Sequence, residues 1–162
     1  GGEYLEQELY QIIKMAWEIE EIPKEWTKSI IATIAKKGDQ KECENYRTIS
    51  MLNHTAKVML NIVLERLQAS VSPFLAEEQA GFRRDRGTVQ QILILRLLAE
   101  KAWRKNKPVY NCFIDFRKAF DTIKHELMWT IMGTFGVDAK IIRVLQCTYD
   151  CSMAAVRVGT EL

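Results

Sequence analysis

The chain has 162 residues, of which 48% are hydrophobic and 27% are charged, with 23 basic side chains against 21 acidic ones. This composition is sufficient for a packed core and excludes a disordered chain. No apolar run reaches the ~20 residues that span a bilayer, and the amino end has no signal peptide. We therefore expect an intracellular protein, in the nucleus or the cytoplasm, without membrane contact.

The small net charge of +2 conceals an uneven distribution of charge along the chain. Residues 1–22 carry six glutamates against one lysine, whereas residues 83–107 carry eight basic side chains against Asp85 and Glu100. A dense positive segment suits a polyanionic partner such as a nucleic acid. A solvated helix face is an equally good interpretation of the charge alone.

The first two thirds of the chain are rich in helical patterns. Apolar residues at helical spacing predict a helix over residues 3–20, which Pro23 stops. Residues 28–35 predict a buried strand, and a polar turn follows over residues 36–45. Residues 54–70 predict an amphipathic helix, and residues 88–104 predict a helix that is apolar on several faces and therefore well buried.

The last third of the chain alternates between strand and helix. Pro108 opens a predicted strand that carries Asp115 at its end. Two helices are expected, over residues 122–135 and 139–149, and alternation of side chains predicts a short strand near residues 153–158. The pattern indicates an α+β protein, helix-rich, with a small and incomplete antiparallel sheet.

The four cysteines do not have the spacing of a disulfide framework. Cys147 and Cys151 can share one helix face, but neither histidine of the chain is near them in sequence. This argues against a zinc site and favours reduced thiols.

Asp115 is the strongest candidate for a catalytic residue. Metal-dependent phosphoryl transfer needs carboxylates on rigid backbone, clustered around two ions about 3.5–4 Å apart. One strand end supplies one such acid and the backbone carbonyl after it, so further ligands must come from elsewhere. Asp121 lies six residues later and is better explained as a helix N-cap. Taken alone, Asp115 is equally compatible with capping a turn.

The segment Phe-Ile-Asp-Phe-Arg-Lys-Ala-Phe-Asp at residues 113–121 resembles the first catalytic motif of reverse transcriptases of non-LTR (LINE-type) retrotransposons. Three further blocks agree in the same order: the strand and basic loop from Trp26 to Asp39, the Asn-Tyr-Arg-Thr-Ile-Ser-Met-Leu stretch at 45–52, and the Gln-Ala-Gly-Phe-Arg stretch at 79–83. Together they cover nearly the whole chain beyond residue 20.

The resemblance implies roles for individual residues. It implies that Asp115 and the backbone carbonyl of Phe116 hold catalytic Mg²⁺, that Lys37 and Arg47 hold the triphosphate of the incoming nucleotide, and that Phe120 excludes a ribose 2′-hydroxyl. The template strand is then contacted by the loop that contains Gln79, Gly81, Phe82, Arg83 and Arg84. Without the resemblance, the same residues describe an exposed basic loop, a core aromatic at Phe120 and an arginine-rich surface turn.

The family also implies a domain organisation and a set of partners. Residues 1–107 correspond to the fingers of a right-hand polymerase with an N-terminal helix, and residues 108–162 correspond to part of the palm. The implied partners are an RNA template, a DNA primer and deoxynucleoside triphosphates. The later aromatic-x-Asp-Asp block of the family does not occur in these 162 residues. We therefore expect a fragment that lacks the rest of the palm and the thumb and is inactive as a polymerase by itself.

Two other functions remain open at this level. The chain could be a decayed, catalytically dead module that still binds nucleic acid through residues 83–107. It could also be a different phosphotransferase with Asp115 as nucleophile, although that kind of site needs an acid two residues later, where Arg117 stands.

Overall fold

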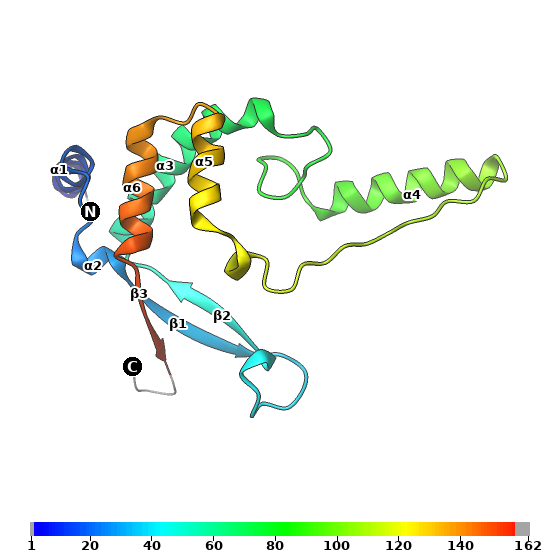
Figure 1. The fold of residues 1–162 in the computed structure, drawn as a ribbon, viewed down its shortest axis with the longest axis horizontal. Coiled ribbons are helices and arrows are strands. Elements are labelled where there is room, and N and C mark those ends of the chain that lie inside the picture. Colours follow the sequence, from blue (N-terminus) through cyan, green and yellow to red (C-terminus); the bar gives the residue numbers. More distant parts are fainter. Residues whose placement is uncertain (1, 158–162) are drawn as a thin grey trace. The chain divides into compact units, whose positions relative to one another are not determined.

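The computed structural model describes residues 2–157, which form two compact units (Figure 1). The first unit contains the chain up to residue 71 and again from residue 129 onward. The second unit contains residues 72–128. The units divide after residue 71 and before residue 129, not at residue 107, the predicted boundary between fingers and palm. The predicted boundary separates functional regions and stays a prediction.

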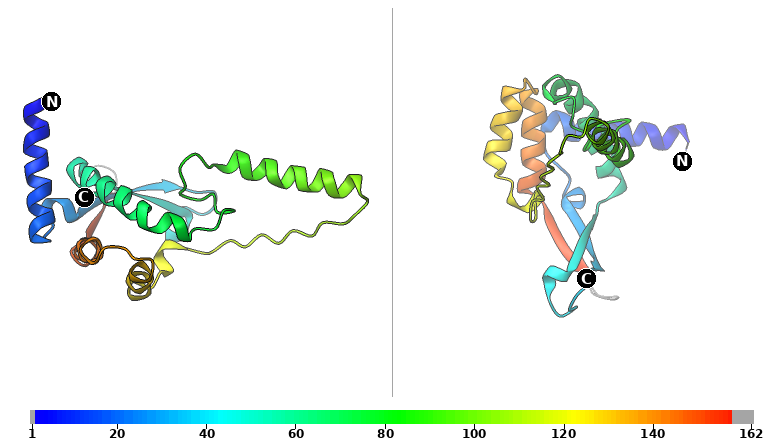
Figure 2. Two further views of the ribbon diagram at one scale, coloured as in Figure 1. Left: turned by 90° about the horizontal axis from the view of Figure 1, so that it is seen from above. Right: turned by 90° about the vertical axis from the view of Figure 1, so that its right-hand side faces the viewer.

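The first unit contains a three-stranded sheet made of β1 (Lys28–Ala35), β2 (Tyr46–Met51) and β3 (Met153–Arg157). The strand order is β2-β1-β3, and the strands run side by side in the right-hand view of Figure 2. β2 pairs with β1 antiparallel, with Thr33 opposite Thr48, whereas β3 pairs with β1 parallel, with Ile31 opposite Val156.

The expectation of a purely antiparallel sheet is therefore wrong. Only residues 36–45 join β1 to β2, and a connection too short for a crossover makes neighbouring strands antiparallel. β3 follows helices instead, and a long connection allows the chain to return in the parallel direction. The sheet is also less buried than expected, because Ser29 is the one buried residue of β1. Val158, the last residue of the predicted third strand, lies outside the described residues.

The longer helices on this unit follow the sequence pattern closely, whereas the short α2 was not predicted. They are α1 (Glu3–Ile19), the short α2 (Lys24–Thr27), α3 (His54–Val71) and α6 (Ala139–Asp150), together with most of α5 (His125–Thr134). The side chain of Asp138 accepts a hydrogen bond from the backbone N–H of Lys140 at 2.7 Å and so caps α6. Gly136 adopts φ +73° just after α5, a conformation that favours glycine.

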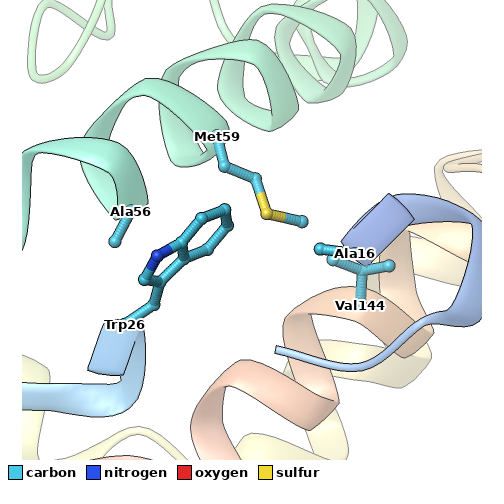
Figure 3. Packing of buried hydrophobic residues seen from close by; sticks show 5 residues of the cluster. All are labelled: Ala16, Trp26, Ala56, Met59 and Val144. Carbon is cyan, nitrogen blue, oxygen red and sulfur yellow. The ribbon is translucent and has the colours of Figure 1, made fainter. Parts of the chain in front are cut away.

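The core of the first unit joins four helices. Its buried side chains are Ala16 of α1, Trp26 of α2, Ala56 and Met59 of α3, and Val144 of α6 (Figure 3). Val144 is the most enclosed of them, with 1% of its surface exposed. This cluster supplies the apolar burial that holds α1, α3 and α6 together.

Charged contacts add to the packing of α1. The guanidinium carbon of Arg66 lies 4.8 Å from the ring centre of Trp17, and the Nζ of Lys140 lies 5.4 Å from the same ring. Arg143 donates two hydrogen bonds to the carboxylate of Glu20, at 2.7 and 2.8 Å. The acidic N-terminal segment is therefore an integral part of the first unit.

The second unit contains η2 (Ser72–Phe74), α4 (Thr88–Arg104) and η3 (Phe120–Thr122). The prediction that α4 is well buried is wrong, because none of its residues is buried and Ile92 is 65% exposed. A helix that is apolar on several faces needs packing partners on several sides, and the described residues do not supply them.

The predicted strand that opens at Pro108 and ends at Asp115 is also absent. Residues 107–116 have no regular secondary structure, although their apolar and aromatic composition favours a strand. A strand is stabilised by hydrogen bonds to a neighbour, and no described strand pairs with this segment. Asp121 lies inside η3 and does not cap α5, which begins at His125. None of the described helices is long and apolar enough to cross a membrane.

Candidate nucleotide and template site

The basic loop between β1 and β2 is closed by its own hydrogen bonds. The backbone N–H of Lys36 donates to the carbonyl of Asn45 at 2.7 Å, and the side-chain amide of Asn45 donates to the carbonyl of Asp39 at 2.7 Å. Gly38 has φ +128°, and a Cβ there would lie 2.9 Å from the Asn45 side chain. The loop therefore needs glycine at this position, for its backbone conformation and for space.

The cations in and beside this loop are not equivalent. Lys36 donates its Nζ to the carbonyl of Glu44 at 3.0 Å and so belongs to the loop's own framework. Lys37 lies in the loop, and Arg47 lies on β2 opposite Ile34 of β1. Both are exposed, and neither forms an ion pair with a described residue. Lys37 and Arg47 are thus available for an anionic ligand. Lys41, farther along the loop, is also exposed and forms no ion pair with a described residue.

The predicted template loop belongs to the second unit and is held by side chains. Arg83 donates to the carbonyl of Ala76 at 2.9 Å, and Arg86 donates to the carbonyl of Glu77. Gln79 donates to the carbonyl of Gly81 at 3.5 Å. Through these bonds Arg83 and Gln79 have a structural role in the loop, in addition to their predicted contact with the template. A Cβ added to Gly81 would meet nothing within 4 Å, so nothing nearby in the fold requires glycine there.

Arg84 has a different environment from Arg83. Its side chain is almost fully exposed, and the contact between its Nε and the Asp85 carboxylate spans 3.9 Å on the surface. A surface pair of this kind contributes little to stability. Arg84 therefore remains open to a phosphate, whereas Arg83 is partly occupied by the loop.

Asp115 and Phe116 lie in the irregular segment of the second unit, and both are exposed. Within residues 2–157 no group of three or more His, Cys, Asp or Glu side chains is arranged to hold a metal ion. The predicted strand before Asp115 is not formed. Both the predicted metal site and the alternative role of Asp115 as a nucleophile assumed that strand. Asp115 thus offers one carboxylate, displayed to solvent on an extended segment.

Phe120 is the first residue of η3 and is 73% exposed, which excludes a core role for its ring within the described structure. Its ring lies 6.2 Å from the ring of Phe82, at an interplanar angle of 78°. The two residues are 38 positions apart in the chain, and no periodicity links them. Sequence reasoning placed one on the template and the other on the nucleotide and missed their contact.

Comparison with known proteins assigns the chain to a family. The family model described as "Reverse transcriptase (RNA-dependent DNA polymerase)" matches residues 34–159, which is well over half of the chain. The chain belongs to the reverse transcriptase family. The sequence-based identification of this family is confirmed, and α1 lies outside the matched range. Reverse transcriptases in general use divalent metal ions.

Several relatives come from mobile elements. The chain is 29% identical over 139 residues to the retrovirus-related Pol polyprotein of the type-1 retrotransposable element R2 of Popillia japonica, covering 85% of this chain and 19% of the relative. It is 32% identical over 107 residues to the probable RNA-directed DNA polymerase from transposon BS of Drosophila melanogaster, covering 64% of this chain and 12% of the relative. The RNA-directed DNA polymerase from mobile element jockey of the same species is 30% identical over 106 residues, with the same two coverages. The relatives confirm the non-LTR retrotransposon assignment, and the chain spans between 12% and 19% of their lengths.

Proposed function

We propose that this chain is the fingers and first palm segment of an RNA-directed DNA polymerase and binds the incoming nucleotide and the RNA template. The observation that carries the proposal is the pair of unpaired cations, Lys37 and Arg47, inside the range that matches the reverse transcriptase family. Flanking a hydrogen-bonded loop, they suit a triphosphate, with the Arg47 guanidinium as a two-pronged donor and Lys37 as a point charge.

The proposed reaction is the extension of a DNA primer along RNA. The primer 3′-hydroxyl attacks the α-phosphate of a deoxynucleoside triphosphate, a phosphodiester bond forms, and pyrophosphate leaves. Lys37 and Arg47 hold the triphosphate in place for this attack, and Phe120 restricts the sugar at its 2′ position. The loop around Phe82 and Arg84 carries the template strand.

The metal ions that this chemistry uses need more ligands than the described residues bring together. Asp115 supplies a single carboxylate, and the carbonyl of Phe116 is the second atom that we assign to the ion. Mg²⁺ prefers several oxygen ligands in octahedral arrangement, so the described residues do not build the site by themselves. We infer that the remaining ligands come from parts of a longer polymerase, in line with the greater length of the relatives. The 162-residue chain by itself is then inactive in primer extension.

The proposal is tested by nucleotide binding to the chain. Arg47→Ala should weaken the binding of a fluorescent deoxynucleoside triphosphate about tenfold or more, since a hydrogen bond to a charged group contributes about 1.5–3 kcal/mol. Lys41→Ala is a matched control, because Lys41 is an exposed cation of the same loop. Binding of a template RNA should change little in either variant. Equal losses of nucleotide and RNA binding in Arg47→Ala would show that Arg47 is not a triphosphate ligand.

A second candidate function is RNA binding without catalysis. The exposed Arg84 and the density of basic residues over positions 83–107 favour it. Single-stranded RNA held through phosphates loses affinity with a slope of about −0.7 per neutralised phosphate in a plot of log K against log salt. A steep slope together with unaffected nucleotide binding in Arg47→Ala would favour this function over the first. A flat salt dependence would exclude it.

A further inference from the structure

The contact between Phe82 and Phe120 has the geometry of a favourable aromatic pair. The centroid separation of 6.2 Å and the interplanar angle of 78° correspond to an edge-to-face arrangement. Both rings belong to the second unit, and both are largely exposed, Phe82 to 89% and Phe120 to 73%. Each ring is thus largely open to solvent, and its aromatic contact among the described residues is with the other.

The backbone at Phe82 is unusual. Its φ of +58° lies in the left-handed region, which costs about 1 kcal/mol or more for a residue other than glycine. Such a conformation persists where the surrounding structure enforces it. Here the hydrogen bonds from Arg83 to Ala76 and from Arg86 to Glu77 fix the loop on the C-terminal side of Phe82.

The far end of the loop is also anchored. The backbone N–H of Gly87 donates to the side-chain oxygen of Gln90 at 2.9 Å, which ties the loop to the first turn of α4. These bonds fix the backbone of the loop, and with it the direction of the Cα–Cβ bond of Phe82, before any ligand binds.

Phe120 is presented by a tight turn of its own. Lys118 has φ +51°, and its carbonyl accepts a hydrogen bond from the backbone N–H of Asp121 at 3.0 Å. The hydroxyl of Thr122 donates to the carbonyl of Ala119 at 3.0 Å. These bonds fix the backbone around Phe120 but do not touch its ring, and among the described residues the aromatic contact of that ring is with Phe82.

A ring that excludes a 2′-hydroxyl works only if it stays in one place, because an exposed ring that changes rotamer leaves room for the larger sugar. We propose that Phe82 is a positioning residue: its ring fixes the orientation of Phe120 and thereby sets the discrimination between deoxyribonucleotides and ribonucleotides. This inference rests on the proposed nucleotide-binding role of Phe120, and it replaces template stacking as the main role of Phe82.

The test measures the ratio of two affinities for the 162-residue chain, that for a deoxyribonucleoside triphosphate over that for the matching ribonucleoside triphosphate. Phe120→Ala should reduce this ratio about tenfold or more, because it removes the clash. Phe82→Ala should reduce it about two- to tenfold, the range of an aromatic pair contact. Phe82→Tyr keeps a ring and should retain the ratio. Phe113→Ala removes an equally exposed phenylalanine of the same unit, outside the pair, and serves as the control.

A second readout does not depend on nucleotide. In a chain with an isotopically labelled Phe120 ring, Phe82→Ala should shift the ring resonances of Phe120, because the neighbouring ring current is lost. Phe113→Ala should not shift them. Unmoved resonances in Phe82→Ala would overturn the inference, since the pair would then not exist in solution.

The outcomes separate the inference from the proposed function. An unchanged ratio in Phe120→Ala would refute the proposed role of Phe120 itself. A reduced ratio in Phe120→Ala with an unchanged ratio in Phe82→Ala would refute only the positioning role. Loss of RNA affinity in Phe82→Ala, with the ratio unchanged, would show that Phe82 stacks on the template instead, since stacking on a base contributes about 1–3 kcal/mol.

Discussion

Replacing Val144 by alanine tests whether the four-helix cluster holds the first unit together. Val144 is 1% exposed and belongs to the same cluster as Trp26 and Met59. Removing two buried methyl groups costs about 1.6 kcal/mol of transfer free energy, and the cavity left behind adds about 1 kcal/mol. The higher helix propensity of alanine returns about 0.5 kcal/mol. We therefore expect the free energy of unfolding to fall by about 2 kcal/mol.

Urea denaturation followed by tryptophan fluorescence measures this loss. In a Trp103→Phe background, the three remaining tryptophans, Trp17, Trp26 and Trp129, all belong to the first unit. With a denaturant slope of about 1.5 kcal/mol per molar, the midpoint in urea should fall by about 1.3 M.

Val58→Ala is the matched control, because Val58 lies on helix α3 of the same unit but is 38% exposed. It makes the same change of side chain with the same gain in helix propensity, so its loss should stay below about 1 kcal/mol. A loss in Val144→Ala no greater than in Val58→Ala would refute the assignment of Val144 to the core.

Two further predictions concern titrating groups. The hydrogen bonds from Arg143 hold the pKa of Glu20 below its ordinary value of 4.5, so the ion pair stabilises the fold above that pH and loses its effect as pH falls through the lowered pKa. The urea midpoint of Glu20→Gln should therefore lie below that of the parent near neutral pH and converge with it in acid, and a gap independent of pH would contradict this. The hydrogen bond with Cys147 raises the pKa of the Cys151 thiol above 9.0. Alkylation of Cys151 by iodoacetamide should accordingly need a higher pH than in Cys147→Ala, as mass spectrometry at a series of pH values will show; equal profiles would exclude the thiol contact.

The helices could be predicted because their signals are local. The apolar spacing in residues 3–20 and 54–70, with a proline just after each, predicts α1 and α3 almost to the residue. The turn at Gly38 is likewise a local property, since few other residues adopt its backbone conformation. The family assignment also rests on local signals, namely short blocks in a fixed order, and it is confirmed by the match over residues 34–159.

The errors concern features that depend on distant partners. Residues 88–104 are apolar enough for a buried helix, and the segment before Asp115 is apolar enough for a strand. Burial and strand pairing also require neighbours, however, and the described residues do not supply them. The parallel pairing of β3 with β1 joins residues more than 120 positions apart, such as Ser29 and Ala154, and a local pattern does not encode the direction of such a pair.

For the candidate site, the sequence by itself determined the family and proposed Lys37, Arg47 and Asp115 as ligands, because family motifs and residue types are properties of short segments. Only the tertiary structure shows that Lys36 forms a hydrogen bond within the loop while Lys37 stays unpaired, and that the rings of Phe82 and Phe120 are in contact. These distinctions depend on which atoms lie within a few ångströms of each other, and segments far apart in the chain come together only when the entropy of closing the loops between them is offset by packing and hydrogen bonds.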